Sequence, residues 1–277
     1  MFPGSKVHDP FKQEQWLTEP ENLRSGAKLI DLWSHTCHGC IKELKQLKKL
    51  RENYKTEIIG VHTPELPIEN RETAKKAVKR HRIDYPVVHD EAAALKNKFG
   101  DPAVKQVLLK EGKVKNVRRG HEPFKQLEEK LAEALEQENQ ETVSETPQLK
   151  HVYFGHENPT PVNRNKVFQG RKRLKPPQHR LPEEPYLEGE WIQREDHLEA
   201  GENARLYIKF EGPEFGIVAE PEGEKKAAVI EDGEKRDDKL KFSRPGLHTL
   251  NTSEQVSELL LQPEKGLKIY GISHSQS

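Results

Sequence analysis

The chain has 277 residues, which is long for one compact domain and favours two. Its 46 basic and 46 acidic residues give a formal net charge of +0, so no overall field attracts it to nucleic acid or to an anionic membrane. No apolar run approaches the roughly 18 residues of a membrane span, and residues 1–6 lack a signal-peptide core. We therefore expect a cytoplasmic chain with no nucleic-acid partner and no membrane span, or a periplasmic or extracytoplasmic one if an export segment is missing.

Predicted strands alternate with predicted helices through the first half. The largely apolar run 27–33 (AKLIDLW) predicts a strand, and Ile41, Leu44, Leu47 and Leu50 follow it at helical spacing. The remaining elements are strands at 57–62 and 86–88, helices within 68–82, 91–99 and 123–135, and a hairpin of 104–110 with 113–118 across Glu111–Gly112. This order indicates an α/β sheet with an antiparallel hairpin at its edge.

The second half has a different pattern. Residues 136–147 are polar and almost free of bulky apolar side chains, which is typical of a linker. We place a first domain at 1–136, a linker at 137–148 and a second domain at 149–277. Short alternating runs separated by Gly, Pro, Asn and Asp predict that the second domain is a β-sandwich. The basic, proline-containing piece 171–185 predicts a surface loop; a nucleic-acid arm there would lack the expected aromatic stacking residues.

Cys37 and Cys40 are the two cysteines of the chain, and they lie where the first strand gives way to the first helix. This spacing lets a disulfide close with little backbone movement. A helix N-terminus and a protonated His38 would both stabilise a thiolate at Cys37. We therefore predict Cys37 as the nucleophile and Cys40 as the resolving thiol of a redox pair, with no cofactor besides their disulfide.

A C-x-x-C motif also occurs in metal sites and by chance. His35, Cys37, His38 and Cys40 offer four nitrogen or sulfur ligands within six residues, but such crowding rarely suits a tetrahedral site without a second ligand pair. The position between an apolar strand and a helix favours redox chemistry, so no residue is assigned to a metal. His35 is expected to affect the thiol pKa more weakly than His38.

The segment 29–40 (LIDLWSHTCHGC) resembles the thioredoxin superfamily, in particular its TlpA/ResA-like branch and, within that, the C-terminal part of DipZ-type proteins. Three further stretches carry the likeness: 60–65 (GVHTPE), 83–90 (IDYPVVHD) and Pro102–Ala103 before a strand. The second half is similar to the sandwich that follows thioredoxin in DipZ-type proteins, which resembles carbohydrate-binding modules. The resemblance thus implies a thioredoxin-like α/β domain followed by an all-β sandwich, and it makes His62 a scaffold residue.

The same resemblance assigns roles to two acids. Asp31, six residues before Cys37, corresponds to a buried carboxylate that assists proton transfer to and from the resolving cysteine. Its alternative is an Asp at a strand end that bonds to the backbone. Glu43 matches the glutamate of a C-x-x-C-x-x-E pattern, but it is equally interpreted as a solvated acid or one favoured by the helix dipole.

Substrate-binding residues also follow from the resemblance. Pro102 corresponds to a cis-proline that faces the disulfide, where the backbone of the preceding Asp101 pairs with substrate. An apparent one-residue insertion before Gly112 leaves Ala103 as the alternative for that position. Trp33 is expected to pack beside the active turn; otherwise it is a core residue.

The predicted activity is that of a thiol-disulfide oxidoreductase that reduces or isomerises protein or small-molecule disulfides and takes electrons from an unidentified donor. Two alternatives stay open: a carbohydrate- or peptide-binding protein with a vestigial redox domain, and a metal-binding protein using the CHGC region. Tyr186, Trp191 and Tyr207 could offer rings to such ligands of the second domain, although aromatic residues in short strands are more often core.

Overall fold

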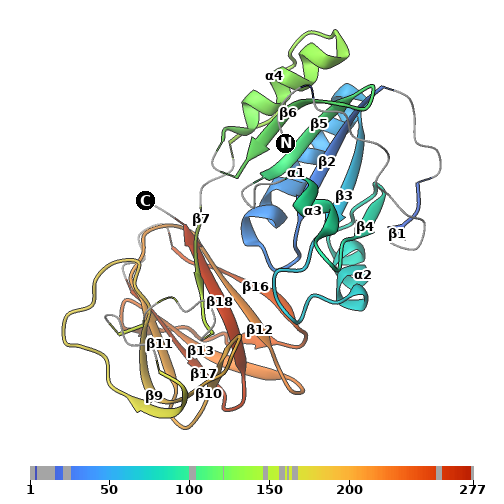
Figure 1. Cartoon of the computed structure of the whole chain (residues 1–277). Helices are drawn as coiled ribbons and strands as arrows, with labels where there is room; N and C mark the ends of the chain where they lie inside the picture. The colour runs from blue at the N-terminus through green and yellow to red at the C-terminus, as the bar shows by residue number, and fades with distance from the viewer. Residues whose placement is uncertain are drawn as a thin grey trace. The chain divides into compact units, whose positions relative to one another are not determined.

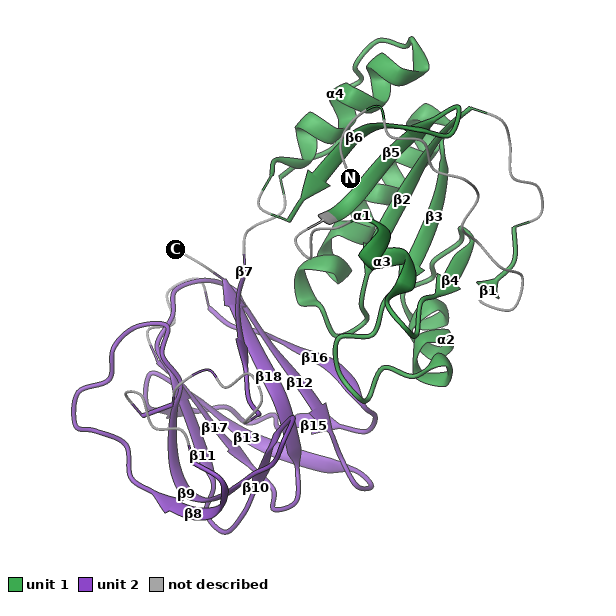
Figure 2. Ribbon diagram, viewed as in Figure 1, with its two compact units in different colours: residues 1–146 green, residues 147–277 purple. Residues whose placement is uncertain are grey.

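The computed structural model describes residues 4, 16–20, 26–99, 104–120, 122–145, 149–155, 160, 162–163, 168–253 and 258–275. The chain divides into two compact units, residues 1–146 and residues 147–277 (Figure 2). Each unit has its own buried apolar core.

The first unit is built on a six-stranded mixed sheet (Figure 1). The strand order is β1-β4-β3-β2-β5-β6; β2, β3 and β4 run parallel to one another, and the other neighbours pair antiparallel. The strands are β1 (Trp16–Thr18), β2 (Ala27–Trp33), β3 (Glu57–His62), β4 (Val87–His89), β5 (Val104–Lys110) and β6 (Lys113–Arg119). Glu111 and Gly112 join β5 to β6 with φ of 54° and 69°, the left-handed pair that a tight two-residue hairpin requires.

Four helices of the described residues cover this sheet: α1 (His38–Tyr54), α2 (Arg71–Arg80), α3 (Ala94–Lys98) and α4 (Phe124–Leu135). The core that contains Leu47 of α1 also takes in Val78 of α2 and Leu131 of α4, whereas Leu95 of α3 belongs to the core on the opposite face of the sheet. None of these described helices is long and apolar enough to cross a membrane.

The predicted α/β order and its edge hairpin are confirmed, and the strands at 27–33 and 57–62 have the predicted bounds. β1 was not predicted, because three residues are too short to show a period. Residues 137–145, predicted as part of the linker, carry no helix or strand and lie against α4. There the backbone amides of Thr142 and Val143 donate to the carboxylate of Glu128, and Val143 is buried.

The second unit is a curled antiparallel sheet that forms a β-sandwich, as predicted. β9 connects its two layers, because residues 186–188 pair with β11 whereas residues 189–193 pair with β8, and residues 191–193 also pair with β10. The strands are β7 (Leu149–Tyr153), β8 (Gly170–Leu174), β9 (Tyr186–Gln193), β10 (Leu198–Ala200), β11 (Arg205–Ile208), β12 (Glu214–Glu220), β13 (Lys225–Glu231), β14 (Glu234–Lys235), β15 (Leu240–Phe242), β16 (Gly246–Asn251), β17 (Leu259–Pro263) and β18 (Lys268–Ser275).

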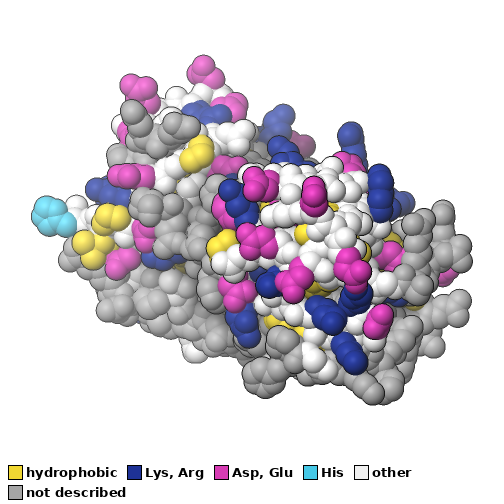
Figure 3. Space-filling model, turned by 90° about the horizontal axis from the view of Figure 1, so that it is seen from above, with side chains coloured by type: hydrophobic (Ala, Val, Ile, Leu, Met, Phe, Trp, Pro, Cys, Tyr) yellow, Lys and Arg dark blue, Asp and Glu magenta, His cyan; other side chains and the backbone are white. Residues whose placement is uncertain are grey.

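The prediction that 171–185 is wholly a loop is wrong. Residues 170–174 form the strand β8, in which Leu174 is buried and the other four residues are exposed. An edge strand with charged outward side chains has the composition of a loop, which hid it from sequence inspection. Two basic residues of 171–185 form ion pairs within the unit: Arg171 pairs with Glu190, and Arg180 with Glu258. On the face shown in Figure 3, basic and acidic side chains of the described residues are interspersed.

The aromatic residues considered as ligand platforms lie in the core of the second unit. Tyr186 and Trp191 are fully buried, and Tyr207 is 9% exposed. The guanidinium of Arg180 covers the Tyr207 ring at 4.6 Å. These three rings are therefore structural, and the core interpretation is the correct one.

Gly189 lies where β9 changes its pairing from β11 to β8, and a substitution there tests how closely the backbone of Asn203 approaches. The φ of Gly189 is +82°, and an added Cβ would lie 2.0 Å from the carbonyl oxygen of Asn203. Gly223 has a similar φ of +72° but open space around it. We expect Gly223→Ala to lower the free energy of unfolding by about 1–2 kcal/mol, from backbone strain alone. Gly189→Ala should cost clearly more, as measured by urea unfolding followed by circular dichroism; equal costs would contradict the close approach.

Candidate functional site

The cysteine pair lies where β2 gives way to α1. β2 ends at Trp33, and Cys37 is the N-cap residue of α1. Cys37 and Cys40 form a disulfide, and the backbone N–H of Cys40 donates to Cys37 Sγ at 3.2 Å. That donor belongs to the first turn of the helix, where unpaired N–H groups and the helix dipole favour negative charge. After reduction, a thiolate on Cys37 is stabilised at this position.

A cation that the sequence did not indicate also faces the pair. Lys105 Nζ, from β5, lies 3.1 Å from Cys40 Sγ and 3.4 Å from Cys37 Sγ. The ammonium group favours the thiolate form of either sulfur through its charge. Lys105 is one of 46 basic residues and is far from the cysteines in sequence, so only the pairing of β2 with β5 identifies it.

Asp31 is buried in β2, with 2% of its surface exposed. Burial raises the pKa of this carboxyl from 3.8 to about 7, although the hydrogen bond from Gln106 opposes the change. Gln106 Nε2 donates to Asp31 Oδ1 at 2.8 Å, and the Tyr85 hydroxyl donates to Oδ2 at 3.5 Å. Its described partners are side chains rather than backbone groups. A carboxyl with this pKa can take up or release a proton near neutrality.

Glu43 joins the same buried network from α1. It is 7% exposed, and its Oε1 accepts from Arg118 Nη2 at 2.9 Å. Arg118 Nη1 donates to Gln106 Oε1 at 2.7 Å, which orients the amide so that its Nε2 faces Asp31 and, at 3.3 Å, Glu43 Oε2. The interpretation of Glu43 as a solvated acid is therefore wrong. Its carboxylate and Arg118 fix the group that holds Asp31.

Of the other predicted site residues, the structure describes His38 and Trp33 but not residues 101–103. His38 is buried in the first turn of α1, and Trp33 is buried with its ring edge-on to His62 at 5.0 Å. Asp101, Pro102 and Ala103 lie outside the described residues. The four-ligand metal set of the CHGC region is not assembled, because the two sulfurs bond to each other and His35 Nδ1 lies 2.8 Å from His62 Nε2.

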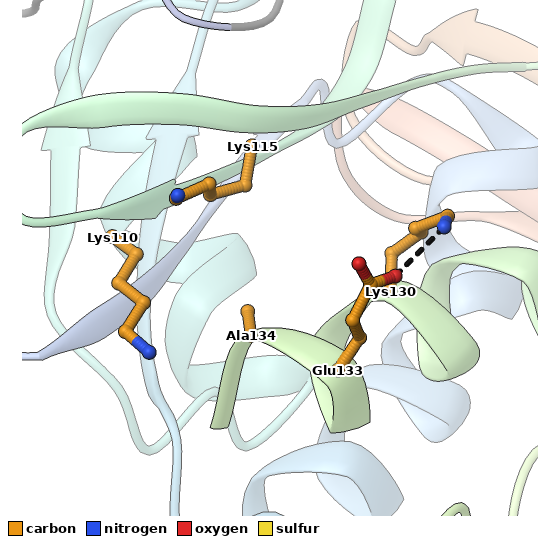
Figure 4. A pocket seen from close by; sticks show the side chains of 5 residues that line it. All are labelled: Lys110, Lys115, Lys130, Glu133 and Ala134. Carbon is orange, nitrogen blue, oxygen red and sulfur yellow. Dashed lines mark hydrogen bonds and ion pairs between the residues drawn. The ribbon is translucent and has the colours of Figure 1, made fainter. Parts of the chain in front are cut away.

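A pocket elsewhere in the first unit does not extend this site. Lys110, Lys115, Lys130, Glu133 and Ala134 line it, at the hairpin of β5 with β6 and the end of α4 (Figure 4). Lys130 pairs with Glu133 inside the pocket, and Lys110 pairs with Glu136. None of these residues belongs to the cysteine network, so we assign the pocket no role.

The comparisons agree with the geometry of the first unit. Residues 10–135 match the Redoxin family. The first unit is therefore a thioredoxin-like oxidoreductase domain. No curated protein matches the chain significantly.

Solved structures resemble about half of the chain. A thioredoxin-like protein in its oxidized form is 23% identical, with 49% of this chain and 98% of that chain covered and a TM-score of 0.43. A thiol-disulfide isomerase from Corynebacterium glutamicum is 16% identical, with coverage of 49% and 98% and a TM-score of 0.41. StoA from Bacillus subtilis is 20% identical, with coverage of 39% and 84% and a TM-score of 0.33.

The raised pKa of Asp31 predicts a pH-dependent stability. A folded-state pKa of about 7 against 3.8 means that the protonated carboxyl stabilises the fold at low pH and that this contribution is lost as the pH rises through 7. The Asp31→Asn variant, which cannot ionise, should exceed the wild type at pH 8 by roughly 2–4 kcal/mol in the free energy of unfolding. At pH 4 the two should be nearly equal.

Urea unfolding of the oxidised proteins at pH 4, 6 and 8 measures this difference. Asp237→Asn is the matched control, because the Asp237 side chain is exposed and a substitution at the surface should change the free energy of unfolding little at each of these pH values. A difference between wild type and Asp31→Asn that stays constant from pH 4 to pH 8 would contradict the raised pKa.

Lys105 predicts a shift in redox equilibrium. Its charge stabilises the thiolate and hence the reduced form, so Lys105→Met should make the reduction potential more negative by about 10–30 mV. The Cys37 thiol should also alkylate more slowly at neutral pH. Lys110→Met, on the same strand but paired with Glu136, is the control and should change neither quantity. An unchanged potential in Lys105→Met would mean that the contact has no influence on the pair.

Proposed function

We propose that this chain reduces or isomerises disulfides of protein substrates through Cys37 and Cys40. The observation that carries the proposal is the disulfide at the N-terminus of α1, within reach of the Lys105 ammonium and in the same domain as a buried carboxyl of pKa about 7. Together these groups supply a stabilised nucleophile, a resolving thiol and a proton acceptor.

The reaction starts from the reduced pair. The Cys37 thiolate attacks one sulfur of the substrate disulfide, which forms a mixed disulfide and releases one substrate thiolate that takes up a proton. Cys40 then loses its proton and attacks Cys37 Sγ, which releases the second substrate thiolate and closes the Cys37–Cys40 disulfide. The substrate gains two electrons and the pair loses two. In isomerisation, a substrate thiolate instead attacks the mixed disulfide and Cys37 leaves reduced.

Each further residue has a proposed role. Asp31 accepts the Cys40 proton, and Glu43 positions Asp31 through Arg118 and Gln106. His38 tunes the Cys37 pKa by its place between the cysteines. The segment 101–103 is proposed to bind the substrate chain, and the buried Trp33 to support the turn from behind. No cofactor is needed besides the disulfide, although an electron donor must reduce it again after each turnover.

We also propose that the two units correspond to the thioredoxin and β-sandwich region of DipZ-type proteins. The order of the units, with an antiparallel sandwich after a thioredoxin-like domain, supports this. In that arrangement the second unit binds part of the substrate, a peptide or a carbohydrate. Its ligand surface must lie outside Tyr186, Trp191 and Tyr207, whose rings are in the core.

The redox equilibrium of the pair tests the direction of the reaction. The chain is equilibrated with glutathione and then dithiothreitol buffers, alkylated and weighed by mass spectrometry. We expect a potential near or below roughly −270 mV, as for a reductant. A value near roughly −120 mV would make the protein an oxidant of an oxidising compartment. If no disulfide forms between Cys37 and Cys40 at any buffer potential, the proposal is wrong.

Single cysteine variants separate the two thiols. Cys40→Ser should accumulate a mixed disulfide between Cys37 and a reducible protein such as insulin, because the resolving step is lost. Cys37→Ser should trap little and should reduce insulin at a rate indistinguishable from buffer. Non-reducing electrophoresis and a turbidity assay measure both outcomes. Equal trapping by the two variants would contradict the assigned nucleophile.

A further inference from the structure

A second polar cluster lies beside residues 34–36, the turn that precedes Cys37 and is called the redox turn below. It is separate from the network of Asp31. His35 comes from the turn after β2, His62 ends β3, and Glu69 precedes α2. His35 and His62 are 1% and 0% exposed, and Glu69 is 2% exposed. One ligand atom from each residue lies within 4.8 Å of the other two. The oxidoreductase mechanism uses none of the three side chains.

The three atoms form a compact triangle. His35 Nδ1 is 2.8 Å from His62 Nε2, and Glu69 Oε1 lies 3.5 Å from the first and 3.7 Å from the second. Tetrahedral Zn²⁺ with bonds of about 2.0–2.1 Å separates its ligand atoms by roughly 3.3 Å. Two edges of the triangle are within a few tenths of an ångström of that value, and the third must open by about half an ångström. Two imidazoles and one carboxylate are donors suited to Zn²⁺ and its neighbours.

Three hydrogen bonds hold the Glu69 carboxylate in place beside the two imidazoles. The backbone amides of Glu65 and Leu66 donate to Oε2, and the Ser34 hydroxyl donates to Oε1, which also faces the imidazoles. Among the described residues, the basic groups within 4.0 Å of this carboxylate are the two imidazoles. A buried carboxylate that no described Lys or Arg reaches is stabilised by a cation that does.

The imidazoles are also arranged for binding. His62 Nε2 is the ring atom within reach of both His35 Nδ1 and Glu69 Oε1. His62 Nδ1 lies 3.1 Å from His89 Nδ1. A metal-bound His62 would therefore donate its remaining N–H to His89, the partner that fixes the orientation of a ligating imidazole.

We propose that His35, His62 and Glu69 bind one divalent transition-metal ion, Zn²⁺ as the reference, at a site separate from the cysteines. The ion takes the place of the hydrogen bond between His35 and His62, and each neutral ring keeps its one proton on the other nitrogen, His35 on Nε2 and His62 on Nδ1. Three protein ligands leave a fourth position for water. The proposal is independent of the redox function, because the metal ligands and the sulfurs are different atoms.

The test uses the full chain in its oxidised form, in which the disulfide removes both sulfurs as ligands. Chelator-treated protein is titrated with Zn²⁺ by calorimetry and with Co²⁺ by absorbance. We expect about one ion per chain, a tetrahedral Co²⁺ spectrum without a sulfur charge-transfer band, and a melting temperature that rises with Zn²⁺ concentration.

Variants locate the ion. Glu69→Gln and His35→Phe should each weaken Zn²⁺ binding by roughly 100-fold or more, since each removes one ligand. Phenylalanine keeps a ring to stack on His62, which His35 does at a centroid distance of 5.0 Å, so this variant preserves packing if Glu69→Gln fails to fold. His81→Gln, at the end of α2, is the control and should bind Zn²⁺ as the wild type does.

Three outcomes would overturn the proposal. The oxidised wild type fails to bind Zn²⁺, or folded His35→Phe binds it as tightly as wild type. In the third, binding occurs only after reduction and is lost in Cys37→Ser, which would place the ion on the cysteines. Near-UV circular dichroism of each variant confirms its fold. If neither variant folds, X-ray absorption of the Zn²⁺-loaded oxidised wild type decides, and a ligand shell without imidazole nitrogen would overturn the proposal.

Discussion

The burial of Asp31 is the constraint on which the rest of the redox site depends. An ionised carboxylate inside a protein is costly unless other groups bond to it, and here the cost appears as a pKa of about 7. Gln106 lowers that cost by a hydrogen bond, and Arg118 holds Gln106 while pairing with Glu43. A single buried acid is thus surrounded by an amide, a guanidinium and a second acid that bond to one another.

The position of β2 between two neighbours explains how separate networks meet near one turn. On one side, antiparallel pairing places Gln106 of β5 opposite Asp31. On the other, parallel pairing places His62 of β3 opposite Trp33, and His89 of β4 opposite His62. Residues distant in sequence therefore become neighbours through strand register, which a shift of one residue would destroy.

Register also explains what the sequence could and could not predict. The cysteine pair, the strand before it and the helix after it are local features, readable from spacing and apolar period. Asp31 and Glu43 were named through resemblance to relatives, but the sequence left open whether Glu43 is solvated. Lys105, Gln106 and Arg118 were missed because they reach the site only through the β2–β5–β6 pairing. β8 was missed because its charged exposed face has the composition of a loop.

The redox turn separates two opposite electrostatic environments. At the sulfurs, the helix N-terminus and the Lys105 ammonium favour negative charge and disfavour a metal cation. Across residues 34–36, the Glu69 carboxylate and the His62 imidazole offer ligand atoms to a cation. The turn is tied to both: Ser34 and Thr36 donate to Glu69, while the Cys37 amide donates to the Ser34 carbonyl. A divalent cation is therefore drawn to the imidazole side, which leaves the thiolate side to disulfide exchange.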